Sequence, residues 1–389
     1  MEKFRNTVTR TGTRSVKWDL RESIFQNKDV LPMWVADMDF PSTDAVKDAI
    51  VERAQHNIYG YTITDQPVKG AIQQWVKKRH QWDIDEKWLL FSPGVVTSLH
   101  MAVQALSNEN DHILIQTPVY PPFYGAVEKH GRKIVKNSLQ LKDGRYEIDF
   151  EDFEQKVTDD QVTLFILCSP HNPLGRVWTE DELHKMADLC LKHNVTIISD
   201  EIHGDLTYPE HTHIPMASFS DEIREQVITC MAPSKTFNLA GLQASYLIVP
   251  NEKKRKSIEK QFSSQGLGML NTFGIVAMEA AYLHGEEWLD QLIQVLDENK
   301  KYVQEKIHEH TDQIKVLDAE GTYLLWLDCR QMGLSSSELK QFFVSNAKVG
   351  LNDGLSFGRE GDGFMRMNIA CPNEIVVEGV NRIIQALNG

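Results

Sequence analysis

The stretch Val227-Ile-Thr-Cys-Met-Ala-Pro-Ser-Lys-Thr-Phe-Asn238 gives the strongest indication of how this chain folds. Its first five residues form an apolar run that predicts a buried strand, and Pro233 ends that run. Lys235 follows two residues later. A lysine at the end of a core strand is poorly hydrated, which favours a neutral, nucleophilic amine that forms a Schiff base with an aldehyde. The alternative is an ordinary solvated loop lysine, and the ends of the other predicted strands bear on that choice.

Length and composition limit the classes of protein to consider. The chain has 389 residues, which predicts two domains, and its 41% hydrophobic and 25% charged residues are typical of a soluble globular protein. A net charge of −14 argues against binding to nucleic acid or to an anionic membrane. Five widely spaced cysteines without a Cys-x-x-Cys pair predict reduced core residues. We therefore expect a cytoplasmic protein without a membrane span or a metal site.

Apolar runs alternate with amphipathic segments over the first 250 residues. Strands are expected at 88–91, 112–116, 162–168, 195–199, 227–231 and 243–249. Helices are expected at 43–57, 67–80, 96–107 and 179–193. This alternation predicts an α/β fold with a mostly parallel central sheet that helices cover on both faces. No Gly-x-Gly-x-x-Gly fingerprint follows any of these strands, so a nicotinamide enzyme is not supported.

The character of the sequence changes near residue 285. Charged helices flank short apolar strands there, at 287–310, 336–347, 323–327 and 364–368. We therefore predict an N-terminal arm over 1–45 that packs with the small domain, a large domain over 46–285 and a small α+β domain over 286–389. The arm is too apolar for a free tail, so it packs on its own core, covers a pocket or crosses to a second subunit.

Polar residues follow several of the predicted strands, where ligands bind in open α/β sheets. Gly94-Val-Val-Thr-Ser98 places a glycine turn at a helix start, where free N–H groups and the helix dipole suit a phosphate. Thr97 adds a hydroxyl donor. Asp200 ends its strand and is suited to keep a heterocyclic nitrogen protonated. A plain helix cap is the alternative for both features.

Three further residues suit the same kind of ligand. The Asn172 amide, in the turn Ser169-Pro-His-Asn-Pro-Leu-Gly175, can donate to a phenolate oxygen, unless it only shapes the turn. Tyr120 can stack on a flat ring, or it packs in its proline-rich turn. Arg366 lies in an apolar strand and needs an anionic partner, either a substrate carboxylate or an internal salt bridge.

Together these residues fit a ligand with an aldehyde, a phosphate, a phenolic oxygen and a ring nitrogen, and pyridoxal 5′-phosphate carries all four. The order of a phosphate turn, an aromatic residue, Asn-Pro-x-Gly, an aspartate at a strand end and Ser-Lys resembles the fold-type I pyridoxal-phosphate enzymes. These form the aspartate aminotransferase superfamily.

A closer resemblance covers nearly the whole chain. Four motifs are similar to the MalY/PatB group of C–S lyases: Leu31-Pro-Met-Trp-Val-Ala-Asp-Met-Asp-Phe40, Phe91-Ser-Pro-Gly-Val-Val96, Ser199-Asp-Glu-Ile-His203 and Ala232-Pro-Ser-Lys-Thr-Phe-Asn-Leu-Ala-Gly-Leu242. The resemblance implies a two-domain homodimer with cystathionine β-lyase activity. Two positions depart from the broader aminotransferase pattern, because His203 stands where many relatives have tyrosine and Gln243 where many have a phosphate-binding arginine.

The resemblance also implies roles for individual residues. Lys235 is the catalytic residue that links to the cofactor aldehyde. The other expected cofactor-binding residues are Tyr61 from the second subunit, Val95, Val96, Thr97, Tyr120, Asn172, Asp200, His203 and Ser234. The expected substrate-binding residues are Ala36, Asn172 and Arg366. Asp200 would pair with the ring nitrogen and Arg366 with the substrate α-carboxylate.

The expected reaction is the α,β-elimination of L-cystathionine or a related cysteine S-conjugate to a thiol, pyruvate and ammonia. Lys235 would remove the Cα proton, and the thiolate would leave from Cβ. An aminotransferase shares every step up to proton removal and is the first alternative. A regulatory protein that keeps the cofactor but binds a partner on its surface is the second.

Overall fold

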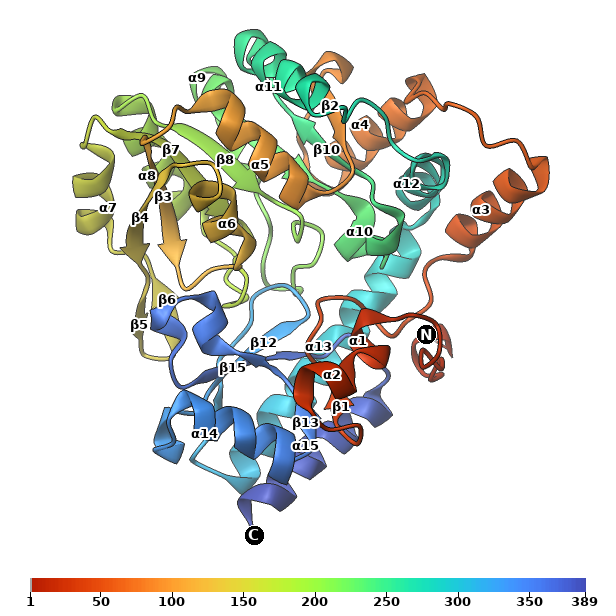
Figure 1. Ribbon diagram of the computed structural model, residues 1–389, viewed down its shortest axis with the longest axis vertical. Coiled ribbons are helices and arrows are strands. Elements are labelled where there is room, and N and C mark those ends of the chain that lie inside the picture. The colour runs from red at the N-terminus through yellow and green to blue at the C-terminus, as the bar shows by residue number, and fades with distance from the viewer. Residues whose placement is uncertain (1) are drawn as a thin grey trace.

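Seven strands pair into one central sheet in the computed structural model, which describes residues 2–389 (Figure 1). The strand order is β2-β10-β9-β8-β7-β3-β4. The strands are β2 (Leu89–Ser92), β3 (His112–Thr117), β4 (Lys133–Ser138), β7 (Val162–Cys168), β8 (Thr196–Asp200), β9 (Val227–Met231) and β10 (Ser245–Ile248). Only β10 runs antiparallel to its neighbours. The predicted fold-type I architecture is confirmed.

Both faces of the central sheet are buried, which explains the nearly continuous apolar strands. Successive residues of one strand belong to two different core clusters: Leu164 and Ile166 to one, Phe165 and Leu167 to the other. The first face is covered by α5 (Val95–Leu106), α6 (Pro122–Glu128) and α11 (Glu252–Ser264). The second is covered by α4 (Gln66–His80), α7 (Phe150–Val157), α8 (Glu180–Lys192), α9 (Asp221–Gln226) and α12 (Thr272–His284). A hairpin, β5 (Gln140–Lys142) and β6 (Arg145–Glu147), lies outside the sheet.

A second, antiparallel sheet forms the lower part of the molecule in Figure 1. Its order is β11 (Lys315–Val316), β12 (Leu324–Asp328), β15 (Phe364–Asn368) and β14 (Asn352–Asp353). The helices of this part are α13 (Glu286–His310), α14 (Ser336–Gln341) and α15 (Asn373–Leu387). The helix expected over 336–347 is shorter than predicted, because a wider π turn follows from Phe342 to Asn346 and buries Phe343.

The N-terminal arm packs on the core of its own chain. After the short helices α1 (Val16–Asp19) and α2 (Arg21–Phe25), β1 (Leu31–Pro32) pairs with β13 (Val349–Gly350). Met33, Met38 and Phe40 are buried. The division into 1–45, 46–285 and 286–389 stays a prediction.

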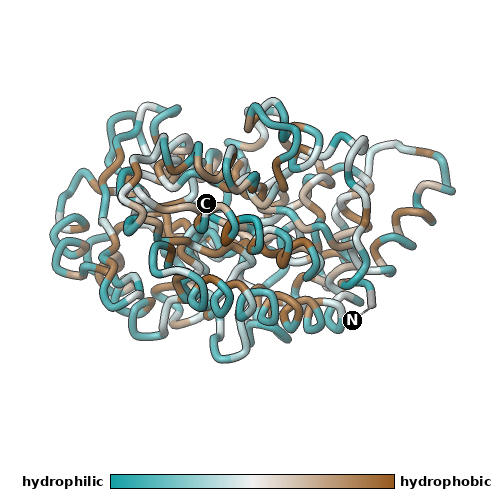
Figure 2. Tube along the Cα trace, turned by 90° about the horizontal axis from the view of Figure 1, so that it is seen from below, coloured by the Kyte–Doolittle hydropathy of each residue, from teal (hydrophilic) through white to brown (hydrophobic). Residues whose placement is uncertain are grey.

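Helix α3 (Asp44–His56) and the loop 57–65 form the right-hand edge of the molecule in Figure 1, where α3 packs against α12 and buries Val46. Figure 2 shows hydrophobic residues in this part. Tyr61 is 96% exposed there. Within residues 2–389, no helix has the length and apolar character that a membrane span requires.

Candidate active site

A cavity of ≈ 190 Å³ lies at the carboxyl ends of the central strands, and residues from the arm and from five separate segments of the large part line it. Ten of the twelve predicted site residues line this cavity: Ala36, Val95, Val96, Thr97, Tyr120, Asn172, Asp200, His203, Ser234 and Lys235. They meet because parallel strands all end at one edge of the sheet. Arg366 reaches the group from below through Asn172, and Tyr61 lies elsewhere.

Lys235 lies in the short helix α10 (Pro233–Thr236), which follows β9 directly. Its Nζ atom donates a hydrogen bond of 2.6 Å to the Ala36 carbonyl oxygen, so the amine points across the cavity to the arm. Burial lowers the pKa of Lys235 to about 8, and the positive charge of Arg366 acts in the same direction. A substantial fraction of the amine is therefore neutral, and hence nucleophilic, in mildly alkaline solution.

Asp200 is the last residue of β8 and lies between Cys168 of β7 and Cys230 of β9. Its side chain accepts a 3.2 Å hydrogen bond from the Ile202 N–H, and no ion pair joins it to any residue in the described range 2–389. Burial raises the pKa of Asp200 to about 7. A buried carboxyl of this kind is stabilised as an anion only when a cationic partner, such as a protonated ring nitrogen, enters the cavity.

Arg366 lies on β15 and is 5% exposed. Its guanidinium donates to the Asn172 amide oxygen at 2.9 Å, to the Trp34 carbonyl at 3.0 Å and to the Asn352 amide oxygen at 2.6 Å. Its Nε atom is buried without a partner, and no carboxylate contacts it within the part of the chain that the structure describes. The internal salt bridge considered as its alternative is therefore absent there.

Arg366 therefore carries a buried positive charge whose hydrogen-bond acceptors in the described structure are all neutral. Burial lowers the pKa of Arg366 to about 10, which still leaves the guanidinium charged at neutral pH. An entering carboxylate would supply the anionic partner that such a fork prefers.

His203 replaces the tyrosine expected from the broader pattern, and it is 3% exposed. Burial, reinforced by the charges of Lys235 and Arg366, lowers the pKa of His203 to about 3, so the imidazole is neutral. Its Nδ1 atom has no hydrogen-bond partner among residues 2–389. Burial also raises the pKa of Tyr120, which keeps that phenol neutral and suited to stack on a ring.

The opposite end of the cavity begins at Gly94, which caps α5 without any side-chain hydrogen bond to the helix. The first N–H groups of a helix have no partner within it, so those of Val95 and Val96 can serve an anion. Gln243 lines this end in a left-handed conformation, with φ 49°. Among the described residues that line the cavity, Lys235 is the one lysine or arginine. A phosphate here would rely on backbone and hydroxyl groups of this chain.

Four residues next to the predicted site residues had no predicted role. Tyr323, Asn238, Asn352 and Asn368 all bind the arm or Arg366. Asn238 lies within the motif that contains Lys235, which is the one signal that pointed to it. The contacts join positions far apart in the chain, so no local pattern contains them.

Asp205 anchors the catalytic segment from behind. Its carboxylate accepts hydrogen bonds from Thr236 at 2.8 Å, from Trp75 at 3.0 Å and from His80 at 2.9 Å. These donors keep the pKa of Asp205 below its usual value even though burial alone would raise it. Because Thr236 follows Lys235, this network ties α10 to α4.

Comparison with known proteins places the chain in a family. A sequence profile described as aminotransferase class I and II matches residues 28–383. The chain belongs to this family. Within the family, the cystathionine beta-lyase PatB of Bacillus subtilis (strain 168) is 48% identical over 385 residues, which cover 99% of this chain and 100% of that protein. The protein MalY of Escherichia coli (strain K12) is 32% identical and covers 99% of this chain and 98% of its own length.

A solved structure of the family agrees with the fold. Cystalysin from Treponema denticola, which contains a pyridoxal 5′-phosphate cofactor, superposes with a TM-score of 0.97 at 35% identity, covering 99% of this chain and 98% of that chain. The resemblance to the MalY/PatB group is thus confirmed.

Proposed function

We propose that this protein is a pyridoxal-phosphate-dependent C–S lyase of the cystathionine β-lyase type. It cleaves L-cystathionine, or a related cysteine S-conjugate, with one water to a thiol such as homocysteine, pyruvate and ammonia. The observation that carries the proposal is the convergence of Lys235, Asp200 and the unpaired Arg366 at one cavity. The similarity to PatB over essentially its whole length supports the choice of reaction.

The groups that lack partners in this cavity fit the cofactor. Lys235 would bind its aldehyde carbon, Asp200 its ring nitrogen, and Asn172 with His203 its phenolic oxygen. Tyr120 would stack on the ring, and the start of α5 with Thr97 and Ser234 would hold the phosphate. When bound, the cofactor withdraws the electrons that proton loss leaves at the substrate Cα. The unpartnered His203 Nδ1 and the raised pKa of Asp200 support this orientation.

The residues of the chain then have separate tasks in the elimination. Arg366 binds the α-carboxylate with Asn172, beside the backbone of Ala36, and so fixes the direction of the Cα–H bond. Once the substrate amine has replaced Lys235 at the aldehyde carbon, the Lys235 amine would be free and neutral, and it would remove the Cα proton as the general base. The electron pair of that bond then expels the thiolate from Cβ, and water releases ammonia and pyruvate from the remaining fragment.

We propose a homodimer in which each subunit completes the other's site. The loop 57–65 exposes four large hydrophobic residues, with Ile58 at 65%, Tyr59 at 55%, Tyr61 at 96% and Ile63 at 71%. Such a cluster is unusual on a monomer and indicates a contact surface. Tyr61 does not line the cavity of its own chain, so a donor to the phosphate of the partner is the role that the family resemblance gives it.

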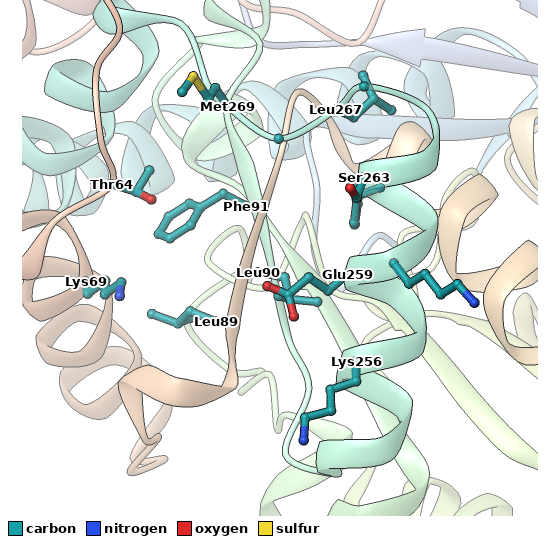
Figure 3. Close-up of a pocket in the computed structure, with 14 residues that line it drawn as sticks. Thr64, Lys69, Leu89, Leu90, Phe91, Lys256, Glu259, Ser263, Leu267 and Met269 are labelled. Carbon is teal, nitrogen blue, oxygen red and sulfur yellow. The ribbon is translucent and has the colours of Figure 1, made fainter.

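A groove beside this loop provides a surface for the second copy. Figure 3 shows Leu89 and Phe91 of β2 on its floor, with Lys256 and Glu259 of α11 on one wall. Because β2 is the edge strand of the sheet, a partner that covers the groove would also protect that edge. We further propose a cytoplasmic location, in keeping with five buried cysteines that are all free thiols.

The decisive experiment measures pyruvate release from L-cystathionine without any 2-oxo acid. We expect stoichiometric pyruvate and thiol, and lower rates with L-cysteine or an S-alkyl cysteine as the alternative substrates. Product that forms only after a 2-oxo acid is added would identify an aminotransferase and contradict the proposal.

A further inference from the structure

Residues 34–38 of the arm cross the cavity as an irregular segment, here named the carbonyl strap. All five of its backbone carbonyls accept hydrogen bonds from side chains of other segments. The donors to Trp34, Val35, Ala36, Asp37 and Met38 are, in that order, Arg366 (3.0 Å), Asn368 (2.5 Å), Lys235 (2.6 Å), Asn368 (2.7 Å) and Asn238 (2.9 Å). The Ala36 carbonyl accepts a second bond of 3.0 Å, from the Tyr323 hydroxyl.

The donors come from two short pieces of chain. Asn238 follows Lys235 by one helical turn, and Asn368 lies on the same strand as Arg366. Lys235 and Asn238 therefore bind the strap from one piece of chain, and Arg366 and Asn368 bind it from the other. Any shift of the strap changes the position of the acceptor that Lys235 uses.

Asn238 holds its end of the strap almost as a strand partner would. Its Oδ1 atom accepts from the Met38 N–H at 3.0 Å, while Nδ2 donates to the Met38 and Phe40 carbonyls at 2.9 and 3.0 Å. Its backbone adopts φ 58°, a left-handed conformation that asparagine tolerates better than most residues. Its side chain thereby replaces sheet hydrogen bonds that the strap does not make.

Asn368 holds the middle of the strap from the small sheet. Its side chain is fully buried, and its Nδ2 donates to the carbonyls on either side of Ala36. Its Oδ1 accepts from the Ala370 N–H at 2.7 Å, which fixes the amide orientation. The Ala36 carbonyl between these two bonds is thus held at a defined place over Lys235.

We propose that Asn238 and Asn368 are positioning residues for proton transfer, because they fix the Ala36 carbonyl that orients the Lys235 amine. A neutral amine has two N–H bonds and one lone pair. When Ala36 accepts one N–H, rotation about the Cε–Nζ bond is restricted and the lone pair faces the cavity. The Cα proton then moves to that lone pair, and the ammonium formed keeps its bond to Ala36.

This inference rests on the proposed function, since it assigns Lys235 the role of general base. It predicts that Asn238→Ala and Asn368→Ala lower kcat for pyruvate release by about 10- to 100-fold, as misplacement of a reacting group does. KM for L-cystathionine should change less than twofold, because Arg366 remains. The deuterium isotope effect on kcat with Cα-deuterated substrate should rise, because proton removal becomes more rate-limiting.

The holoenzyme of each variant is compared with Asn137→Ala, a matched control. Asn137 is fully buried, as Asn368 is, and uses Nδ2 for two hydrogen bonds, to the Asp149 carbonyl at 3.0 Å and to Asp152 at 2.9 Å, but it lies in β4. Thermal melts and cofactor content measure any loss of folded protein. For an alanine variant that does not fold, the nearly isosteric Asn238→Asp and Asn368→Asp take its place, since they remove the N–H donors.

Two outcomes overturn different statements. A lower kcat with an unchanged isotope effect reports only fewer active molecules, and it overturns the positioning role while leaving the proposed reaction intact. Exchange of the substrate Cα proton with D₂O at the wild-type rate in Lys235→Ala would instead show that the general base is elsewhere. That result overturns the assignment on which the inference rests.

Discussion

Asp200 and Asp205 lie in the same turn of chain and are similarly buried, at 4% and 7% exposed, yet their pKa values shift in opposite directions. Asp205 receives three hydrogen bonds from side chains of its own protein, so its charge is satisfied. Asp200 receives one backbone hydrogen bond and faces an open cavity. Both carboxyl groups are buried, so the number of hydrogen-bond donors around each explains the difference in pKa. A buried carboxyl with few donors suits a ligand, whereas one with several donors acts as a structural anchor.

The strongest test of this comparison uses two lysines whose pKa values are both lowered by burial, to about 8. Lys235 lines the cavity. Lys254 lies on α11, outside the cavity, and donates a hydrogen bond to the Glu225 carbonyl. Lys235→Ala should reduce pyruvate release by at least about 10³-fold, because the general base is lost. Borohydride should fix the cofactor to Lys235.

Lys254→Ala is the control and should retain near wild-type activity. A cofactor adduct mapped to Lys254, or to any other lysine, would show that a lowered pKa without a cavity is sufficient for reaction.

The next effect concerns Asp200 in the holoenzyme. Asp200→Asn should lower kcat and kcat/KM together by about 10²–10³-fold, because an amide cannot keep a ring nitrogen protonated. Cofactor content should fall much less, since the contacts to aldehyde and phosphate remain. Pyruvate release is therefore measured per bound cofactor. A turnover close to that of the wild type would make Asp200 a helix cap and would require another orientation of the cofactor.

Replacing each aspartate by asparagine should change the stability of the cofactor-free protein in opposite directions. Asp205→Asn should destabilise the cofactor-free protein by about 3 kcal/mol at pH 7, as breaking a buried charged network does. Because the pKa of Asp205 is lowered in the folded state, its stabilisation is present above the ordinary aspartate range and disappears as pH falls through it. The difference in melting temperature from the wild type should therefore shrink toward pH 3.

Asp200→Asn should behave in the opposite way in the same melts. Its folded pKa is raised to about 7, so the cost of the buried carboxyl to the cofactor-free fold grows as pH rises from the unfolded pKa, is complete above pH 7, and vanishes below the unfolded pKa. The variant should melt higher than the wild type at pH 8 and at the same temperature near pH 3. A lower melting temperature at pH 8 would contradict the absence of a partner for Asp200.

The smallest expected effect concerns the hydroxyl group of Tyr61, which is exposed on the surface of its own chain. Tyr61→Phe should weaken cofactor binding about tenfold, the size of one hydrogen bond to a charged group. Tyr59→Phe is the control, because that hydroxyl donates to the Ala54 carbonyl of its own chain at 3.0 Å. At a limiting cofactor concentration, mixed Tyr61→Phe and Lys235→Ala subunits should release more pyruvate than either variant alone, because one hybrid site carries both native residues. No recovery after proven subunit exchange would refute a shared site.

Strand periodicity and the chemistry of strand ends were sufficient to predict the sheet and most of the cavity. Lys235 and Asp200 both follow apolar runs, and parallel strands bring such ends together whatever the loops do. The carbonyl strap was not predicted, because Asn368 contacts positions more than 300 residues earlier. Asp205 was missed for the same reason, since its three donors come from α4 and α10, two elements far from it in the sequence. The strand β4 was missed because it shows neither an apolar run nor an alternation: its only apolar residues, Ile134 and Val135, are adjacent, and its one buried residue is the polar Asn137.

The strap also has a consequence for biosynthesis. Ala36 of the strap lines the cavity, and residues 34–38 are among the first to leave the ribosome, whereas the strand β15 that binds them lies near the end of the chain. The seven strands of the central sheet all precede residue 249 and can pair while translation continues. The contacts that hold the strap cannot form at that stage, because Arg366 and Asn368 have not yet been synthesised. A nascent chain therefore has a formed sheet before it has a usable cavity, and the enzyme becomes competent only when synthesis is nearly complete.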